Sequence, residues 1–127
     1  MTKWLILAAI FIVVQSCDSD PDESIVCTEE FRTIGVNITG VDLTAFYTVR
    51  TSTEDTIRLQ KFGTDLLSDF YPILDDSYLP KLENDQDTFV FYGFESGAIT
   101  PKVEEQYVIK ADQCHIELVS GKTEINF

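Results

Sequence analysis

The chain has 127 residues, a formal net charge of −13 and a single histidine. This length predicts one domain. The charge argues against nucleic acid as a partner, because phosphate binding requires clustered Lys and Arg. It also argues against electrostatic adsorption on anionic lipids, so a covalent lipid should supply any membrane attachment.

The first segment is typical of an export signal. Lys3 gives a positive start, and residues 4–14 form an unbroken apolar run of 11 residues. That run suits the apolar core of a signal peptide and is shorter than the roughly 20 residues of a membrane-spanning helix. We therefore expect residues 1–16 to be a signal peptide. The alternatives are a plain secretory signal cleaved near Ser16 and an uncleaved anchor helix.

The sequence Val14-Gln15-Ser16-Cys17 resembles the lipobox of bacterial lipoproteins, although Gln15 departs from the usual residue before the small one. The resemblance implies cleavage before Cys17 and attachment of diacylglycerol to its sulfur, since a thiolate is the required nucleophile. Two or three fatty chains, palmitate among them, anchor a protein stably, whereas one chain binds only marginally. We predict a lipoprotein of the cell envelope whose membrane contact is the lipid on Cys17.

Residues 17–25 form an acidic tether. Four acids lie within residues 18–23 together with Ser19 and Pro21, a composition that is flexible and self-repelling. The segment resembles the acid-rich export signal of surface lipoproteins in the Bacteroidota, which implies an address on the outer leaflet of the outer membrane. A solvated linker without an address is the alternative.

With Cys17 assigned to lipid, Cys27 and Cys114 remain as an even pair in an exported protein, which predicts one disulfide. A zinc site would need more ligands than two thiols and one histidine supply. A Cys114–His115 nucleophile pair is disfavoured because neighbours in a strand point to opposite faces. No cofactor is expected.

From residue 30 onward, apolar residues recur with period two, which predicts strands. Residues 63–70 read either as a short helical turn or as a loop, residues 98–101 as extended chain, and residues 75–87 as a long polar loop. Pro72 requires an edge position. The predicted strands are residues 32–38, 43–51, 56–62, 71–74, 88–94, 103–110, 114–119 and a short last strand ending at Phe127.

Residues 88–94 give the strongest strand, with Phe89 and Phe91 on one face and Val90, Tyr92 and Phe94 on the other. Apolar residues on both faces predict a central strand that is covered on both sides. Seven or eight short strands with frequent turns are typical of two packed sheets or one closed sheet. We predict an all-β antiparallel sandwich, Ig-like or transthyretin-like, over residues 26–127.

The stretch from Glu104 to Ile116, followed by Ser120-Gly121, resembles the C-terminal hairpin of small Bacteroidota lipoproteins with carboxypeptidase-regulatory or transthyretin-like sandwiches. One enzyme branch of the transthyretin-like group uses several histidines and a Tyr-Arg-Gly-Ser ending. This chain has one histidine and ends Glu124-Ile125-Asn126-Phe127, so that activity does not carry over.

No residue set predicts catalysis. A hydrolase needs a nucleophile beside an oriented base, and His115 lies in a predicted strand without a Gly-x-Ser-x-Gly motif, so we expect a surface or edge histidine. Glu104 and Glu105 face apart as strand neighbours, which does not suit a glycosidase pair. The chain is therefore not expected to be an enzyme.

Acidic side chains around the predicted loop are the best candidates for a cation site, because calcium prefers six to eight oxygens from such loops. The loop lacks the glycine and the distant glutamate of an EF-hand, so a solvated acidic loop is the competing interpretation. The candidate ligands are Asp75, Asp76, Glu83, Asp85 and Asp87.

Two surface features remain. The sequence Asp55-Thr56-Ile57 resembles the O-glycosylation motif of Bacteroidota envelope proteins, which implies a glycan on Thr56. Most aromatic residues must fill a two-sheet core, but Tyr47 and Tyr92 could form an outward pair. We expect a non-catalytic binding or accessory module whose ligand the sequence does not identify, with a glycan or a peptide as candidates; the alternative is a structural lipoprotein that binds another envelope protein.

Overall fold

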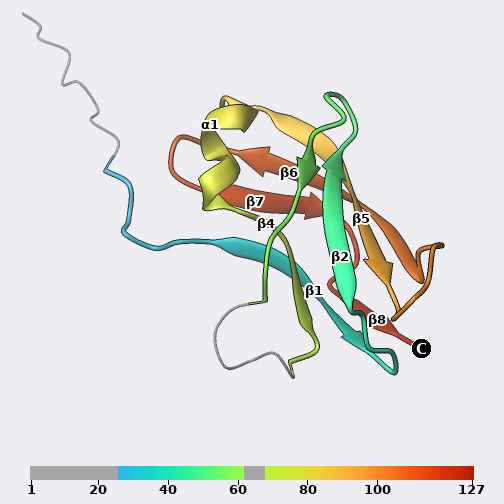
Figure 1. Cartoon of the computed structure of the whole chain (residues 1–127). Coiled ribbons are helices and arrows are strands. Elements are labelled where there is room, and N and C mark those ends of the chain that lie inside the picture. The colour runs from blue at the N-terminus through green and yellow to red at the C-terminus, as the bar shows by residue number, and fades with distance from the viewer. Residues whose placement is uncertain (1–25, 62–67) are drawn as a thin grey trace, which may run out of the picture.

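The computed structural model describes residues 26–61 and 68–127, so the predicted signal peptide, the tether and Cys17 lie outside the described residues. Two sheets of five and three strands pack face to face, which confirms the all-β sandwich. Figure 1 shows the two layers, with the one short α-helix of the described chain at one end of them.

The larger sheet has the strand order β3-β2-β5-β6-β7, and every pairing in it is antiparallel. Its central strand β5 carries Phe89 and Phe91 on the inner face, where both are fully buried. The predicted position of this strand is therefore confirmed. The strands of this sheet are β2 (Ala45–Arg50), β3 (Thr56–Ile57), β5 (Gln86–Phe94), β6 (Val103–Ala111) and β7 (Ile116–Ser120).

The smaller sheet has the order β4-β1-β8, formed by β4 (Phe70–Asp75), β1 (Thr33–Thr39) and β8 (Glu124–Asn126). β1 and β4 are antiparallel, but β8 runs parallel to β1. Val36 and Ile38 of β1 and Ile73 of β4 are fully buried between the sheets. The single parallel pairing joins the first and last strands of the described domain.

The predicted long loop over residues 75–87 is wrong in part. It contains the 3-10 turn η1 (Asp76–Tyr78), the helix α1 (Leu79–Leu82) and the first residues of β5. The Asp75 side chain caps η1 by accepting a hydrogen bond from the Ser77 N–H at 3.0 Å, and Pro80 lies in the first turn of α1. Tyr78 and Leu82 are buried, so this polar segment covers part of the core.

The turn between β7 and β8 requires glycine. Gly121 has a φ of +137°, and a Cβ there would lie 2.2 Å from Cδ1 of Tyr107. The buried Tyr107 ring packs under this turn, and its hydroxyl donates a hydrogen bond to the Lys122 carbonyl at 2.8 Å. Burial raises the pKa of Tyr107 well above its usual value, so the hydroxyl stays protonated and keeps donating.

Candidate functional site

The turn between β6 and β7 is shaped by one carboxylate. Asp112 accepts hydrogen bonds from the N–H groups of His115 at 2.8 Å and Cys114 at 2.7 Å, and these bonds lower the pKa of Asp112. In this position Cys114 forms a disulfide with Cys27, with the two Cα atoms 5.2 Å apart. The predicted disulfide is confirmed, and it holds the entering chain against this turn.

Asp76 lies beside the disulfide at the end of β4 and is 9% exposed. Its Oδ2 accepts hydrogen bonds from the Arg32 N–H at 2.8 Å and from Nδ1 of His115 at 2.8 Å, and its Oδ1 accepts one from the Ile116 N–H at 2.9 Å. Burial alone would raise the pKa of Asp76, but these hydrogen bonds outweigh it and lower the pKa. The buried carboxylate is therefore ionised and fully partnered.

His115 directly precedes β7, an edge strand of the larger sheet, but it is only 7% exposed, so the predicted edge position is confirmed and the predicted surface position is wrong. An ionised carboxylate can only accept hydrogen bonds. Nδ1 of His115 is therefore the protonated ring nitrogen, and it donates the hydrogen bond to Asp76. The other ring nitrogen, Nε2, lies 2.9 Å from Oγ1 of Thr28. We call Thr28, Asp76 and His115 the Asp76 clamp, since they join the entry segment (residues 26–32, before β1), η1 and the turn that precedes β7.

Sequence reasoning missed the clamp because its members are far apart along the chain. Thr28 and His115 are 87 residues apart, and Asp76 and His115 are 39 apart. One signal was nevertheless available: Thr28 follows Cys27 and His115 follows Cys114. A disulfide between the cysteines brings their neighbours together as well.

The clamp has the order hydroxyl, imidazole, carboxylate, in which hydrolases activate a nucleophile. A hydrolase also aims hydrogen-bond donors at the oxyanion of its intermediate. Within residues 26–61 and 68–127, His115 is the only hydrogen-bond partner of the Thr28 hydroxyl. What the geometry does supply is a polar cross-link between three segments at the point where the chain enters the sandwich.

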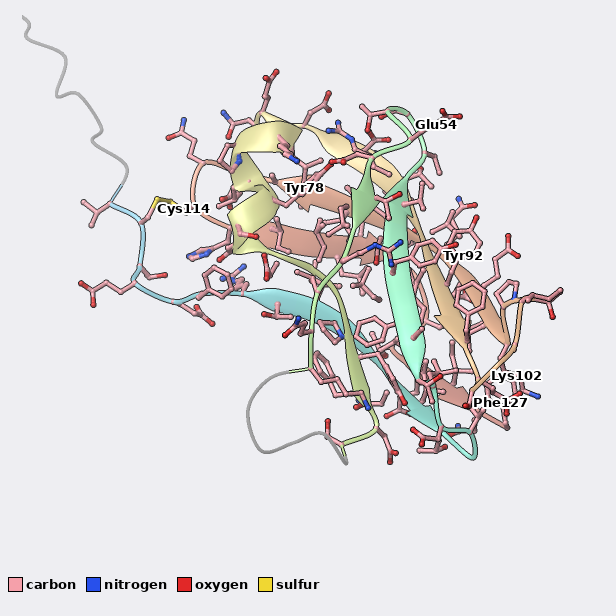
Figure 2. The ribbon with its side chains drawn as sticks, in the orientation of Figure 1. Glu54, Tyr78, Tyr92, Lys102, Cys114 and Phe127 are labelled. Carbon is pink, nitrogen blue, oxygen red and sulfur yellow. A yellow bond between two sulfur atoms is a disulfide. The ribbon has the colours of Figure 1, made fainter. Side chains whose placement is uncertain are left out.

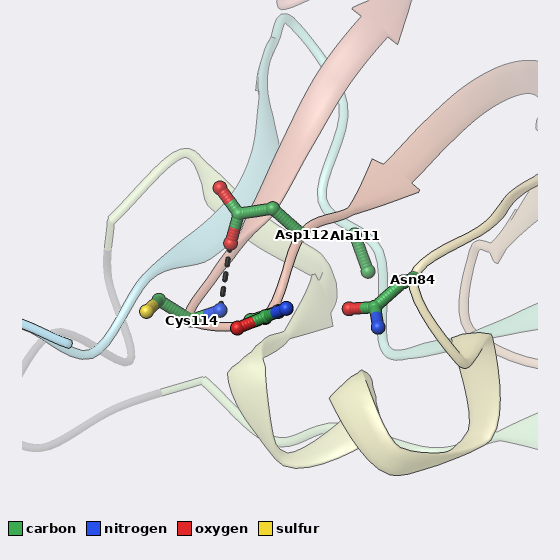
Figure 3. A pocket seen from close by; sticks show the side chains of 5 residues that line it. Asn84, Ala111, Asp112 and Cys114 are labelled. Atoms are coloured by element: carbon green, nitrogen blue, oxygen red, sulfur yellow. Dashed lines mark hydrogen bonds between the residues drawn. The ribbon is translucent and has the colours of Figure 1, made fainter. Parts of the chain in front are cut away.

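A surface pocket of about 490 Å³ lies beside the disulfide and is shown in Figure 3. A second pocket of about 480 Å³ adjoins it on the α1 side and includes Asp76 and Pro80. Both are lined by Asn84, Asp112 and Gln113, which are exposed turn residues. The two pockets therefore form one shallow surface at this end of the molecule.

At the α1 end of β2, an ion pair ties the sheet to the helix. Nε of Arg50 lies 2.5 Å from Oδ2 of Asp87, and Nη1 of Arg50 donates to the Lys81 carbonyl at 2.9 Å. The hydrogen bond to Asp87 raises the pKa of Arg50. Burial alone would raise the pKa of Asp87, but hydrogen bonds from Ser52 and Arg50 lower it. Asp87 is thus neutralised by a partner on β2.

The structure does not gather the five predicted calcium ligands. Asp75 caps η1, Asp76 belongs to the clamp, and Asp87 pairs with Arg50, while Glu83 and Asp85 are exposed. In the part of the chain that the structure describes, no group of three or more His, Cys, Asp or Glu side chains could hold a metal ion. Three of these acids are bound to partners within the protein, and the other two face solvent.

The second candidate site is the outer face of the larger sheet, which points away from the smaller sheet. Figure 2 shows Tyr92 on the side of β5 opposite to β1 and β4. The predicted cover on both sides of β5 is therefore wrong for the described residues, because only the inner face is covered. We define the outer face by the apolar Tyr47, Val49, Val90, Tyr92, Phe94 and Val108 and the charged Arg58, Glu104, Lys110 and Glu117, which alternate with buried residues along their strands.

Aromatic rings on this face contact one another across strands. Tyr47 and Tyr92 are register partners with ring centroids 5.4 Å apart, which confirms the outward pair. Phe94 stacks on Tyr47 at 5.7 Å, and the Arg58 guanidinium lies 5.0 Å from the Tyr47 ring centroid. Other aromatic residues of these strands, Phe46, Phe89, Phe91 and Tyr107, belong to the inner side and fill the core, as predicted.

Two smaller predictions can be placed. Thr56 is exposed on the edge strand β3, where its hydroxyl is accessible; O-glycosylation stays a prediction that intact mass would check. Glu104 and Glu105 do face apart, because Glu104 lies on the outer face and Glu105 pairs with Lys122 at 3.4 Å on the other side. They do not form a carboxylate pair across a cleft.

No protein-family model, curated protein or solved structure matches the chain. Among residues 26–61 and 68–127, no helix has the length and apolar character that crossing a membrane requires.

Proposed function

We propose that this chain is a lipid-anchored protein of the cell envelope, attached to the outer membrane through Cys17, whose sandwich is a non-catalytic binding module. The observation that carries the binding role is the outer face, where Tyr47, Tyr92 and Phe94 form a partly exposed aromatic group. Aromatic side chains that are half exposed and preorganised by their neighbours are typical of binding surfaces.

The disulfide and the Asp76 clamp support this role by fixing where the chain enters. Cys27 and Thr28 come directly after the predicted tether, and each is joined to its partner, Cys114 or His115, at the β6–β7 turn. A force on the tether of an anchored chain would therefore be resisted by the disulfide and by the Asp76 clamp before it reached β1. The sandwich can be displayed on its tether without losing its first strand.

Anchoring predicts a labelling result. Cells that express the full chain and are fed radioactive palmitate should yield a labelled protein in the membrane fraction, because the Cys17 sulfur carries acyl chains. Cys17→Ser should abolish the label and release the protein from membranes. Unlabelled wild-type protein, or a variant that fractionates like wild type, would contradict the anchor.

The binding role predicts face-dependent partners. After gentle crosslinking of intact cells, the wild-type chain should form adducts, or the detergent-extracted chain should bind a glycan or peptide array. Tyr47→Ala/Tyr92→Ala should reduce either signal about tenfold, while an aromatic pair worth roughly 0.5–1.5 kcal/mol leaves the fold intact. Phe31→Ala, an exposed aromatic truncation before β1 and away from this face, is the matched control. Equal signals from all three proteins would sink the proposal.

A further inference from the structure

The outer face is neutral in an acidic protein. The charged side chains on this face are two bases, Arg58 and Lys110, and two acids, Glu104 and Glu117, whereas the whole chain has a net charge of −13. Lys110 and Glu117 already pair with each other at 3.2 Å. The repulsion that keeps acidic chains apart is therefore weakest where two copies meet through this face.

Arg58 and Glu104 lie at opposite ends of one row across the sheet. Tyr47 is the register partner of Tyr92, and Tyr92 is the partner of Glu104. Thr48 pairs with Ile57, so Arg58 extends the same row beyond Tyr47. We call Arg58, Tyr47, Tyr92 and Glu104 the charged row. With strands about 4.8 Å apart, the row is about 14 Å long and runs from positive to negative.

A row of this kind is complementary to itself. Consider two sheets packed face to face and related by a twofold axis that runs along the strands between Tyr47 and Tyr92. The rotation reverses the row, so Arg58 of each copy faces Glu104 of the other, and aromatic rings meet in the centre. A twofold axis along the row would instead place like charges opposite each other, which is unfavourable. The charge pattern thus selects one arrangement, an isologous pair of aligned sheets.

The available area suits a weak pair. The axis between Tyr47 and Tyr92 overlays the four strands from β3 to β6, which span about 14 Å, and the nine residues of β5 span about 30 Å, so the flat face is at most roughly 400 Å² per copy. Two copies together bury about 800 Å², which is the size of a weak or transient interface. The apolar residues Val49, Val90 and Val108 would then gain the cover that the described chain does not give them.

We infer that a second copy of this chain docks on the outer face, with Arg58 of each copy paired to Glu104 of its partner. The inference rests on the outer face as the binding surface of the proposed function, and names its partner. It is independent of the lipid, because the charged row lies wholly in the sandwich.

A charge-swap experiment on the full chain tests this pairing. Two epitope tags are placed after Phe127 on separate copies, which are coexpressed, extracted in mild detergent and purified through one tag while the other is measured. The wild-type copies should purify together. Two Arg58→Glu copies, or two Glu104→Arg copies, should lose at least about tenfold of the second tag, because like charges then meet twice.

The decisive combination is Arg58→Glu with Glu104→Arg. The first copy then carries two acids and the second two bases at the row ends, so both contacts become attractive and co-purification should return. Lys122→Glu changes the charge by the same amount away from this face and should behave like wild type. Equal recovery from every combination, as shared micelles would give, overturns the pairing.

Two further outcomes are distinguishable. Absence of rescue in the mixed pair overturns the second copy as the partner. Array binding that needs Tyr92 without any co-purification overturns it in favour of a glycan or peptide, and leaves the binding role standing. Failure of palmitate labelling affects only the anchor, because tagged sandwiches still pair through the row.

Discussion

Replacing Cys27 and Cys114 together by serine is expected to lower the free energy of unfolding by about 4–5 kcal/mol. The bond closes a loop of 87 residues, and in the chain-entropy model a loop of this length restricts the unfolded chain strongly. A sandwich of this size has about 5–15 kcal/mol of stability in total, so the variant should be close to unfolding at 37 °C. Urea denaturation followed by near-ultraviolet circular dichroism measures the loss.

The chain before β1 makes few apolar contacts that could offset the loss of the disulfide. Val26 is 87% exposed and Phe31 is 60% exposed, so the chain before β1 buries little apolar surface in the described structure. Cys17→Ser is the matched control, since it removes a cysteine outside the pair together with the proposed lipid and should leave the denaturation midpoint of the sandwich unchanged. A double variant within about 1 kcal/mol of wild type would show that the loop constraint is not a main source of stability.

The two-sheet architecture was predictable where burial follows the strand period. In β5, Phe89 and Phe91 alternate with Val90 and Tyr92, and the structure buries the first pair and leaves the second partly exposed. The disulfide was predictable from the two cysteines that remain once Cys17 is assigned to lipid. Both inferences depend on local pattern or on counting, which sequence supplies directly.

Non-local contacts account for the failures. The composition of residues 75–87 is polar, and this predicted a loop. Tyr78 and Leu82 nevertheless lie in the core, and these two apolar side chains are enough to hold a short helical segment against it. His115 gives no sign of burial in its own segment, since its partner Asp76 lies in η1, 39 residues away along the chain. The parallel pairing of β8 with β1 likewise joins residues almost a full domain apart.

Asp76→Asn is expected to lower the free energy of unfolding by about 3 kcal/mol at pH 7. In the variant, the amide oxygen can take the place of Oδ2 and accept the hydrogen bonds from the Arg32 N–H and from Nδ1 of His115. The amide nitrogen then faces the Ile116 N–H, and two donors cannot form a hydrogen bond. The pKa of Asp76 is lowered in the folded state, so its stabilisation is present above the unfolded value of about 3.9 and is lost as pH falls through the folded pKa. The difference between variant and wild type should therefore shrink from pH 7 to pH 2.

Its neighbour provides the matched control. Asp75 is also buried, but its Oδ1 accepts both of its hydrogen bonds, from the Ser77 N–H and hydroxyl, and an asparagine oxygen can do the same. Asp75→Asn should cost no more than about 0.5 kcal/mol, because Asn and Asp cap equally well. In a double-mutant cycle, Asp76→Asn and His115→Ala should couple by about 1–2 kcal/mol. If the losses in unfolding free energy from Asp76→Asn and His115→Ala simply added, or if Asp75→Asn cost as much as Asp76→Asn, the Asp76 clamp would not be a coupled source of stability.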